Sequence, residues 1–161
     1  MKLIAAVSAD WGIGKNNGLL FNIPTDMKFF RETTKGKTVI LGRKNLESFP
    51  GGKPLKNRVN IVLTRNKDFC CEDAVVCGNV EEVLNSGYDL SDAFVIGGEE
   101  IYRQFLPYCD TCYITKVSAS VPCDKYMVNL DKLPEWILSE QSSETEDNGY
   151  KIRFCTYKKR V

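Results

Sequence analysis

The sequence predicts an α/β fold: one domain over residues 1–161, with a mostly parallel eight-stranded sheet, an antiparallel C-terminal hairpin and about four flanking helices. Three observations support this prediction. Short apolar runs alternate with amphipathic segments along most of the chain, a pattern typical of parallel strands joined by helices. The last two strand-like stretches are separated by a link containing Asn148-Gly149, a dipeptide that favours tight hairpins. No internal repeat, low-complexity segment or long linker divides the chain.

Strands are predicted where apolar residues run together between turn-forming residues. The first such run, 3–9, ends at Asp10. The stretch 150–159 instead alternates, through Ile152, Phe154 and Thr156, as a strand with two different faces does. The predicted strands are 3–9, 38–42, 59–64, 74–78, 92–98, 111–119, 136–144 and 150–159.

Helices are predicted between these strands. Pro24 suits a first helical turn because its φ is fixed and it has no N–H to leave unpaired. Gly36, between two lysines, is a helix stop signal. The predicted helices are 24–34, 43–49, 80–85 and 99–109. The stretches 10–21 and 50–57 are rich in glycine and other turn residues and are predicted as loops, and a loop as long as 10–21 is often functional.

Composition excludes several classes of partner. The net charge is +1, so no strong overall field attracts nucleic acid or an acidic membrane. No apolar run approaches the roughly 20 residues that a membrane span needs. The apolar start of the chain stops at Asp10, and no small-residue cleavage site follows it. We therefore expect a cytoplasmic protein.

The chain contains no histidine, which excludes Ser–His–Asp and Cys–His catalysis. Any proton transfer must use a carboxylate, a tyrosine, a lysine, a cysteine or water. Seven cysteines are present, and Cys109 and Cys112 form a CxxC pair that could indicate zinc or redox chemistry. Because no second CxxC and no histidine completes a metal site, we expect structural thiols and no metal.

Asp26 falls in the first turn of the predicted helix 24–34, and the rings of Phe29 and Phe30 follow three and four residues later. The positive end of the helix favours the carboxylate anion, whereas desolvation by the phenyl rings favours the neutral acid. No basic residue lies three or four residues further on. A carboxylate in this position is a candidate functional group. The alternative is a surface aspartate that only stabilises the helix start.

Three successive strand ends carry groups suited to a phosphorylated ligand. They are Gly42-Arg43-Lys44, Thr64-Arg65 and Ile96-Gly97-Gly98-Glu99. In open parallel sheets, ligands bind outside the carboxyl ends of the strands. Paired glycines let the backbone approach a diphosphate, and arginine presents a fork of donors to phosphate. Each signal alone is weak, because paired glycines at a strand end are more often an ordinary turn, and the GxGxxG fingerprint is absent. Two separate arginine positions favour NADP over NAD.

These motifs resemble the dihydrofolate reductase family, in order and spacing, over essentially the full length of the chain. The family implies eight strands and four helices, and NADPH-dependent reduction of 7,8-dihydrofolate to 5,6,7,8-tetrahydrofolate, which supplies one-carbon metabolism. It also implies antifolate inhibitors as ligands, and we expect a monomer. The matching segments are LIAAVS, GIGKNNGLLFNIPTDMKFF, VILGRKNLESF, VNIVLT, VIGGEEIYRQFLP and YITKV.

For the substrate, the resemblance implies that Asp26 hydrogen-bonds the amidine edge of the pterin and that Thr115 orients Asp26. Ile4 and Ala5 would offer backbone carbonyls to the ring. Arg58 resembles the arginine that binds the glutamate α-carboxylate, although alone it reads as a solvated charge at a strand start. The side chains expected to line the pocket are Met27, Phe30, Phe49, Leu55 and Ile96.

For the cofactor, the resemblance implies a 2′-phosphate and adenosine site after two strands, a diphosphate turn at the paired glycines, and a nicotinamide site under loop 10–21. Tyr102 would lie near the transferred hydride. The positions carried over are Ala6, Ile13, Gly14, Leu19, Gly42, Arg43, Lys44, Asn45, Thr64, Arg65, Ile96, Gly97, Gly98, Glu99, Glu100, Ile101 and Tyr102.

The positions expected to take part in catalysis are Asp26, Thr115, Tyr102 and Phe21. Asp26 would raise the proton affinity of the pterin electrostatically, water would protonate its nitrogen 5, and loop 10–21 would close over the site. The chain departs from the family pattern at Phe21, where tryptophan is usual, and at Asn45, where threonine is usual. It also departs in the stretch 123–128, where Asp124 is kept.

Two other functions stay open at this point. One is a related pterin or pyrimidine reductase, such as the riboflavin-pathway reductase that shares the fold, although that family does not show NIPTDMKFF. The other is a non-catalytic NADPH- or folate-binding protein, which the departure at Phe21 suggests.

Overall fold

The computed structural model describes residues 1–161 and confirms the predicted α/β class. The strands are β1 Lys2–Val7, β2 Gly12–Lys15, β3 Gly18–Leu19, β4 Thr38–Gly42, β5 Val59–Leu63, β6 Val75–Cys77, β7 Phe94–Gly97, β8 Thr111–Val117, β9 Lys125–Tyr126, β10 Trp136–Gln141, β11 Thr145–Asp147 and β12 Tyr150–Lys159. The helices are α1 Pro24–Thr34, α2 Arg43–Glu47, α3 Val80–Leu84 and α4 Glu99–Phe105, with 3-10 turns at Pro50–Gly52, Leu106–Tyr108 and Leu130–Lys132.

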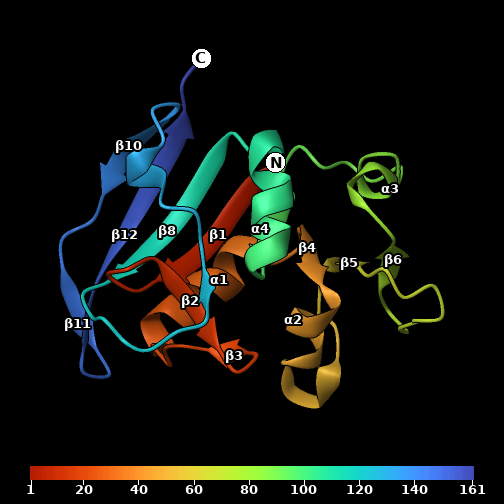
Figure 1. The fold of residues 1–161 in the computed structure, drawn as a ribbon, viewed down its shortest axis with the longest axis horizontal. Coiled ribbons are helices and arrows are strands. Elements are labelled where there is room, and N and C mark those ends of the chain that lie inside the picture. The colour runs from red at the N-terminus through yellow and green to blue at the C-terminus, as the bar shows by residue number, and fades with distance from the viewer.

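The central sheet has the strand order β10-β12-β8-β1-β7-β4-β5-β6, and the short β11 adds to β12 (Figure 1). The strands from β8 to β6 pair in parallel, and β12 joins β8 and β10 in antiparallel fashion. At the predicted hairpin, Asp147 pairs with Tyr150 across Asn148 and Gly149, whose φ values are 51° and 83°. Positive φ at both central residues is what a type I′ turn requires.

The prediction of a plain loop over 10–21 is wrong. Residues 12–19 form a small hairpin, β2–β3, whose turn uses Asn16 and Asn17 with φ values of 51° and 62°. Asparagine tolerates this left-handed conformation better than most residues do. Strand β9 pairs with the other side of β2. We call the resulting sheet β3-β2-β9 the small sheet.

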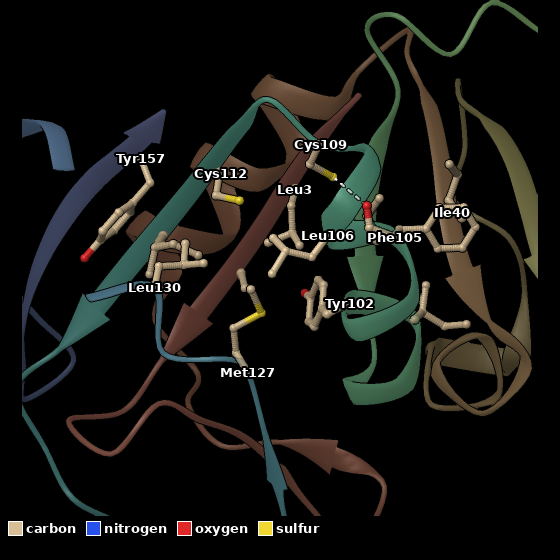
Figure 2. Close-up of a cluster of buried hydrophobic side chains, with 14 of the residues drawn as sticks. Leu3, Ile40, Tyr102, Phe105, Leu106, Cys109, Cys112, Met127, Leu130 and Tyr157 are labelled. Atoms are coloured by element: carbon tan, nitrogen blue, oxygen red, sulfur yellow. Dashed lines mark hydrogen bonds between the residues drawn. The ribbon is translucent and has the colours of Figure 1, made fainter. Parts of the chain in front are cut away.

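The main core lies on the α4 face of the central sheet. Figure 2 shows Leu3 and Cys112 from the sheet packed with Tyr102 and Phe105 from α4. Cys109 is also buried there, and its thiol donates to the Phe105 carbonyl oxygen at 3.4 Å (Figure 2). Burial raises the pKa of Cys109 to about 12, which keeps the thiol protonated. All seven cysteines are free thiols.

The opposite face of the sheet carries α1 and α2. Ile4, Val39 and Phe94 form a second core cluster there, against which Phe30 of α1 packs only half-buried. Incompletely covered rings on this face, next to the ends of parallel strands, leave apolar surface for a ligand. None of the helices has the length and hydrophobicity to cross a membrane.

Candidate active site

Asp26 and Thr115, which the family resemblance pairs, lie in contact. Asp26 stands in the first turn of α1, and the Thr115 hydroxyl on β8 donates to Asp26 Oδ1 at 2.6 Å. None of the ion pairs in the structure involves Asp26. Burial raises the pKa of Asp26, and the hydrogen bond from Thr115 partly opposes that rise. One carboxylate oxygen is therefore fixed by the protein, and the other is left for a ligand.

The start of α1 is held by a residue that the sequence analysis missed. Ile23 occupies the N-cap and cannot accept a hydrogen bond through its side chain. Asp147 of β11 does so instead, because its Oδ2 accepts from the Thr25 amide at 2.7 Å and from the Thr25 hydroxyl at 2.6 Å. No sequence signal links these positions, since they are distant along the chain. The bond pins the helical turn that carries Asp26.

Both rings beside Asp26 contact the core cluster around Ile4, but only one of them has close aromatic neighbours. Phe30 packs half-buried against the cluster around Ile4. Phe29, which the spacing also placed beside Asp26, contacts the same cluster and packs against Phe154 and Tyr113, with ring centroids 4.9 and 6.3 Å away. Met27 is 43% exposed. The other expected lining residues join the Ile4 cluster as buried or half-buried side chains: Phe49, Leu55 and Ile96.

Tyr102 is buried, and its hydroxyl donates to the Ile4 carbonyl oxygen at 2.8 Å. Burial raises the pKa of Tyr102 well above its usual range, so the phenol stays protonated. Tyr102 therefore holds the Ile4 carbonyl of β1, directly before Ala5 and Ala6, in place. Because its phenol stays protonated, Tyr102 cannot act as a base. Phe21 packs edge-on against Tyr150 with centroids 5.0 Å apart, and the Phe21 side chain itself has no hydrogen-bond donor.

A long cleft of about 920 Å³ lies between the small sheet and the ends of β4, β5 and β7. It collects most of the residues that the sequence assigned to a dinucleotide. These are Ile13, Gly14, Leu19, Gly42, Arg43, Lys44, Asn45, Thr64, Arg65, Gly98, Glu99, Glu100 and Ile101. Four expected residues do not line it: Ala6, Ile96, Gly97 and Tyr102. The lining residues that sequence reasoning missed are Lys15, Asn17, Gly18, Ser48, Leu63, Asn66, Gly78, Asn79, Gln104 and Lys125.

The cleft suits an anionic ligand that lies along it. Arg65 takes part in no ion pair or side-chain hydrogen bond, whereas Arg43 is paired with Glu47 at 3.2 Å. Thr64 Oγ1 accepts from the Asn66 amide at 3.1 Å and keeps its own proton for a ligand. A Cβ added at Gly98 would meet no protein atom within 4 Å, so ligand atoms have room at that position.

Asn45, which departs from the family pattern, links two elements beside the cleft. Its Nδ2 donates to the Ile96 carbonyl oxygen at 3.2 Å and joins α2 to the end of β7. The paired glycines Gly97 and Gly98 follow directly after that carbonyl. Asn45 therefore helps to hold the glycine turn that borders the cleft.

Arg58 lies where a second anionic group could bind. Its Nε donates to the Lys56 carbonyl oxygen at 3.0 Å, and one terminal nitrogen donates to Thr34 Oγ1 at 3.4 Å. Burial and the nearby charge of Arg31 lower the pKa of Arg58. Two guanidinium groups that repel one another favour a carboxylate between them. The sequence analysis missed Arg31.

Replacing Thr115 with valine should move the acidic limb of the pH profile of kcat/KM to higher pH. The Thr115 hydroxyl lowers the pKa of Asp26, so its loss lets desolvation raise that pKa further. A pH profile of kcat/KM measures the change. Thr111→Val is a matched control, because Thr111 is a buried threonine on the same strand whose hydroxyl donates to Asp110. An unmoved limb in Thr115→Val would contradict the coupling.

The chain is similar to known proteins over nearly its whole length. The family model described as dihydrofolate reductase matches residues 1–159. The dihydrofolate reductase of Bacillus subtilis is 35% identical, with 99% of this chain and 95% of that protein covered. The dihydrofolate reductase of Haemophilus influenzae is 36% identical, with 94% of each covered.

Longer relatives and a solved structure agree with this match. The bifunctional dihydrofolate reductase-thymidylate synthase of Glycine max is 36% identical, and the chain spans 33% of its length. A solved dihydrofolate reductase from Enterococcus faecalis, complexed with NADP(H) and RAB-propyl, superposes with a TM-score of 0.89 at 32% identity. The match covers 99% of this chain and 96% of that one.

Proposed function

This chain belongs to the dihydrofolate reductase family and reduces 7,8-dihydrofolate to tetrahydrofolate with NADPH, and we propose the residues through which it does so. The observation that carries this assignment of residues is the half-buried Asp26 carboxylate. It has Thr115 on one oxygen and no cation beside it. It lies on the face of the sheet where the apolar side chains are incompletely covered.

Asp26 recognises the pterin. A carboxylate meets two parallel N–H donors of a planar amidine edge bidentately. The Thr115 hydrogen bond fixes the plane of the carboxylate, and the Pro24 and Thr25 turn, held by Asp147, fixes its position. The negative charge raises the proton affinity of the bound ring. Because Tyr102 stays protonated and the chain has no histidine, water delivers the proton to the ring nitrogen.

The rest of the substrate follows the apolar surface away from Asp26. Phe30, Phe49 and Leu55 offer half-buried apolar surface suited to an aromatic ring system. The Ile4 carbonyl, already fixed by Tyr102, has a second lone pair for the pterin. Arg58, with Arg31 nearby, binds the glutamate carboxylate. Antifolates that present the same amidine edge compete for Asp26.

The long cleft holds NADPH, and its residues fit that cofactor. Arg65, Thr64 and Arg43 provide donors for the 2′-phosphate of the adenosine half. The open space at Gly98 accommodates the diphosphate, and Ile13, Gly14 and Leu19 of the small sheet cover the nicotinamide end. When bound, NADPH supplies the hydride that the protein cannot. Leu19 is 78% exposed in the structure. A bound nicotinamide, or a shift of the small sheet, would cover it.

We also propose that residues 1–161 act as one reductase domain, as a monomer, in the cytoplasm. One continuous central sheet with its cores supports a single domain. The near-neutral net charge of +1 gives no reason for binding to nucleic acid or membrane.

The test of the assignment is NADPH oxidation after addition of dihydrofolate to the purified chain. We expect turnover with dihydrofolate and none with the aminouracil substrate of a riboflavin-pathway reductase. Tetrahydrofolate should form in equal amount to the NADPH consumed. Binding of both ligands without turnover would instead indicate a non-catalytic binding protein, and would overturn the proposal.

A further inference from the structure

The small sheet forms one wall of the cofactor cleft. Ile13, Gly14 and Lys15 of β2 and Lys125 of β9 line it, opposite Arg65 and the glycine turn. Figure 1 shows β2 and β3 beyond the end of the central-sheet strand β1. Helix α2 lies on the other side of the cleft from them. The small sheet pairs with no strand of the central sheet, so contacts other than strand pairing hold it in position.

One of these contacts comes from an irregularity in β9. Two amides that flank Tyr126 donate to β2 and the residue before it. The Asp124 amide, two residues earlier, donates to the Gly14 carbonyl oxygen at 3.0 Å, and the Met127 amide, one residue later, donates to the Trp11 carbonyl oxygen at 2.9 Å. The pairing register of β2 and β9 shifts between Gly12 and Gly14. The Tyr126 amide is thereby left without a strand partner, and it donates instead to Glu99 Oε2 at 2.7 Å.

Glu99 is well placed to hold that amide. It is the first residue of α4 and follows the glycine turn directly. Its side chain is 22% exposed, and its other oxygen, Oε1, lies 3.4 Å from a guanidinium nitrogen of Arg103. A short hydrogen bond from an amide to an oriented, partly desolvated carboxylate is stronger than a neutral one. The carboxylate is thus occupied on both oxygens.

The bond belongs to a chain of contacts that spans the cleft. Asp124 Oδ2 accepts from the Asn16 amide at 3.1 Å, which ties β9 to the tip of the β2–β3 hairpin. Asn17 Nδ2 then donates to the Lys44 carbonyl oxygen at 3.4 Å, on α2. Contacts therefore run from α4 through the small sheet to α2, with the Glu99–Tyr126 bond as the link at the α4 end.

We propose that Glu99 is a positioning residue that fastens the small sheet over the nicotinamide end of the cleft, and that it acts through β9 without contacting the cofactor. This inference rests on the proposed function. It gives Glu99, which lines the cleft, a different role from the direct cofactor contact that the resemblance implies. A carboxylate beside a diphosphate would repel it, but the Tyr126 amide and Arg103 engage both oxygens of Glu99.

The first test measures hydrogen exchange at the Tyr126 amide, which reports directly on its bond to Glu99, in the protein without cofactor. In Glu99→Ala, hydrogen exchange at the Tyr126 amide should accelerate by at least about tenfold, because its acceptor is gone. Glu99→Gln keeps a side-chain carbonyl acceptor and should restore most of the protection. Exchange at Tyr126 that is unchanged in Glu99→Ala would overturn the proposal, whatever the activity of the variant.

The second test measures hydride transfer in a single turnover at saturating NADPH and dihydrofolate. Loss of one charge-assisted hydrogen bond should slow the step about tenfold in Glu99→Ala. Glu99→Gln should recover most of the rate. Glu82→Ala is the matched control, because Glu82 also lies in a first helical turn and accepts a backbone amide, from Gly78 at 2.5 Å. It should lose stability comparably and keep its hydride-transfer rate.

Equal slowing in Glu99→Ala and Glu82→Ala, at matched loss of thermal stability, would reduce Glu99 to an ordinary stabilising residue and overturn the proposal. So would a full rate in Glu99→Ala. The unsubstituted protein separates this result from the proposed function: if it does not reduce dihydrofolate, the proposed function fails, and the exchange measurement on Tyr126 still tests the bond.

Discussion

Asp26→Asn is expected to lower kcat/KM for dihydrofolate about 100-fold at neutral pH, the scale on which a positioned acid–base group contributes. Asparagine can still accept from Thr115, but its amide nitrogen cannot accept from the pterin's amidine edge. It also carries no charge to raise the proton affinity of the ring. Steady-state kinetics with NADPH in excess measures the loss.

The deficit of Asp26→Asn should shrink as the pH falls. Burial raises the pKa of Asp26, so the carboxylate of the unsubstituted protein is progressively protonated and loses its advantage as the pH falls through that value. Over the same range solvent protonates the substrate and replaces the missing electrostatic effect. A ratio of rates that stays constant from neutral to acidic pH would contradict the role of Asp26.

Thermal unfolding of the same variant supplies the control for correct folding. The folded pKa of Asp26 lies above the unfolded one, so folding disfavours its charged form at neutral pH. The cost is absent below the unfolded pKa of about 4. Asp26→Asn should therefore melt at a higher temperature than the unsubstituted protein at neutral pH, and at the same temperature below about pH 4. Each kcal/mol of relieved cost corresponds to about 2–4 °C for a protein of this length.

Much of the fold and site could be predicted because the signals are local. Helix α1 begins at Pro24, and β4 spans Thr38–Gly42, as their apolar pattern and turn residues indicate. The strand ends with Arg43, Thr64 and Gly98 meet at one cleft because parallel strands end on the same side of the sheet. These features depend on the order of neighbouring residues, which the sequence displays directly.

The features that could not be predicted depend on contacts between distant segments. Asp147 caps the turn around Thr25 from 122 residues away along the chain. The partner of Glu99 is an amide that is free only because β2 and β9 pair irregularly, and neither short strand has a clear pattern. The aromatic neighbours of Phe29 follow from where Phe154 and Tyr113 lie in the sheet. Spacing along one helix contains no such information.

Arg65→Ala should weaken NADPH binding about 10- to 100-fold, the range expected for the loss of one or more hydrogen bonds to a charged group. Arg65 takes part in no ion pair in the structure, so its guanidinium has no internal partner to give up when phosphate binds. It lines the cleft beside Thr64, whose hydroxyl proton is also free. NADH lacks the 2′-phosphate, so its binding should weaken less than about threefold, because only the long-range attraction of the Arg65 charge is lost.

Equilibrium titration with each cofactor separates the two effects. Lys67→Ala is a suitable control, because Lys67 carries the same charge two residues away and does not line the cleft. It should weaken both cofactors slightly and equally, and added salt should abolish that effect. In Arg65→Ala the preference for NADPH over NADH should fall and stay low at high salt, because a direct phosphate contact is lost. Equal weakening of NADPH and NADH in Arg65→Ala would show that Arg65 contributes only to the general field of the cleft, and that the 2′-phosphate is bound elsewhere.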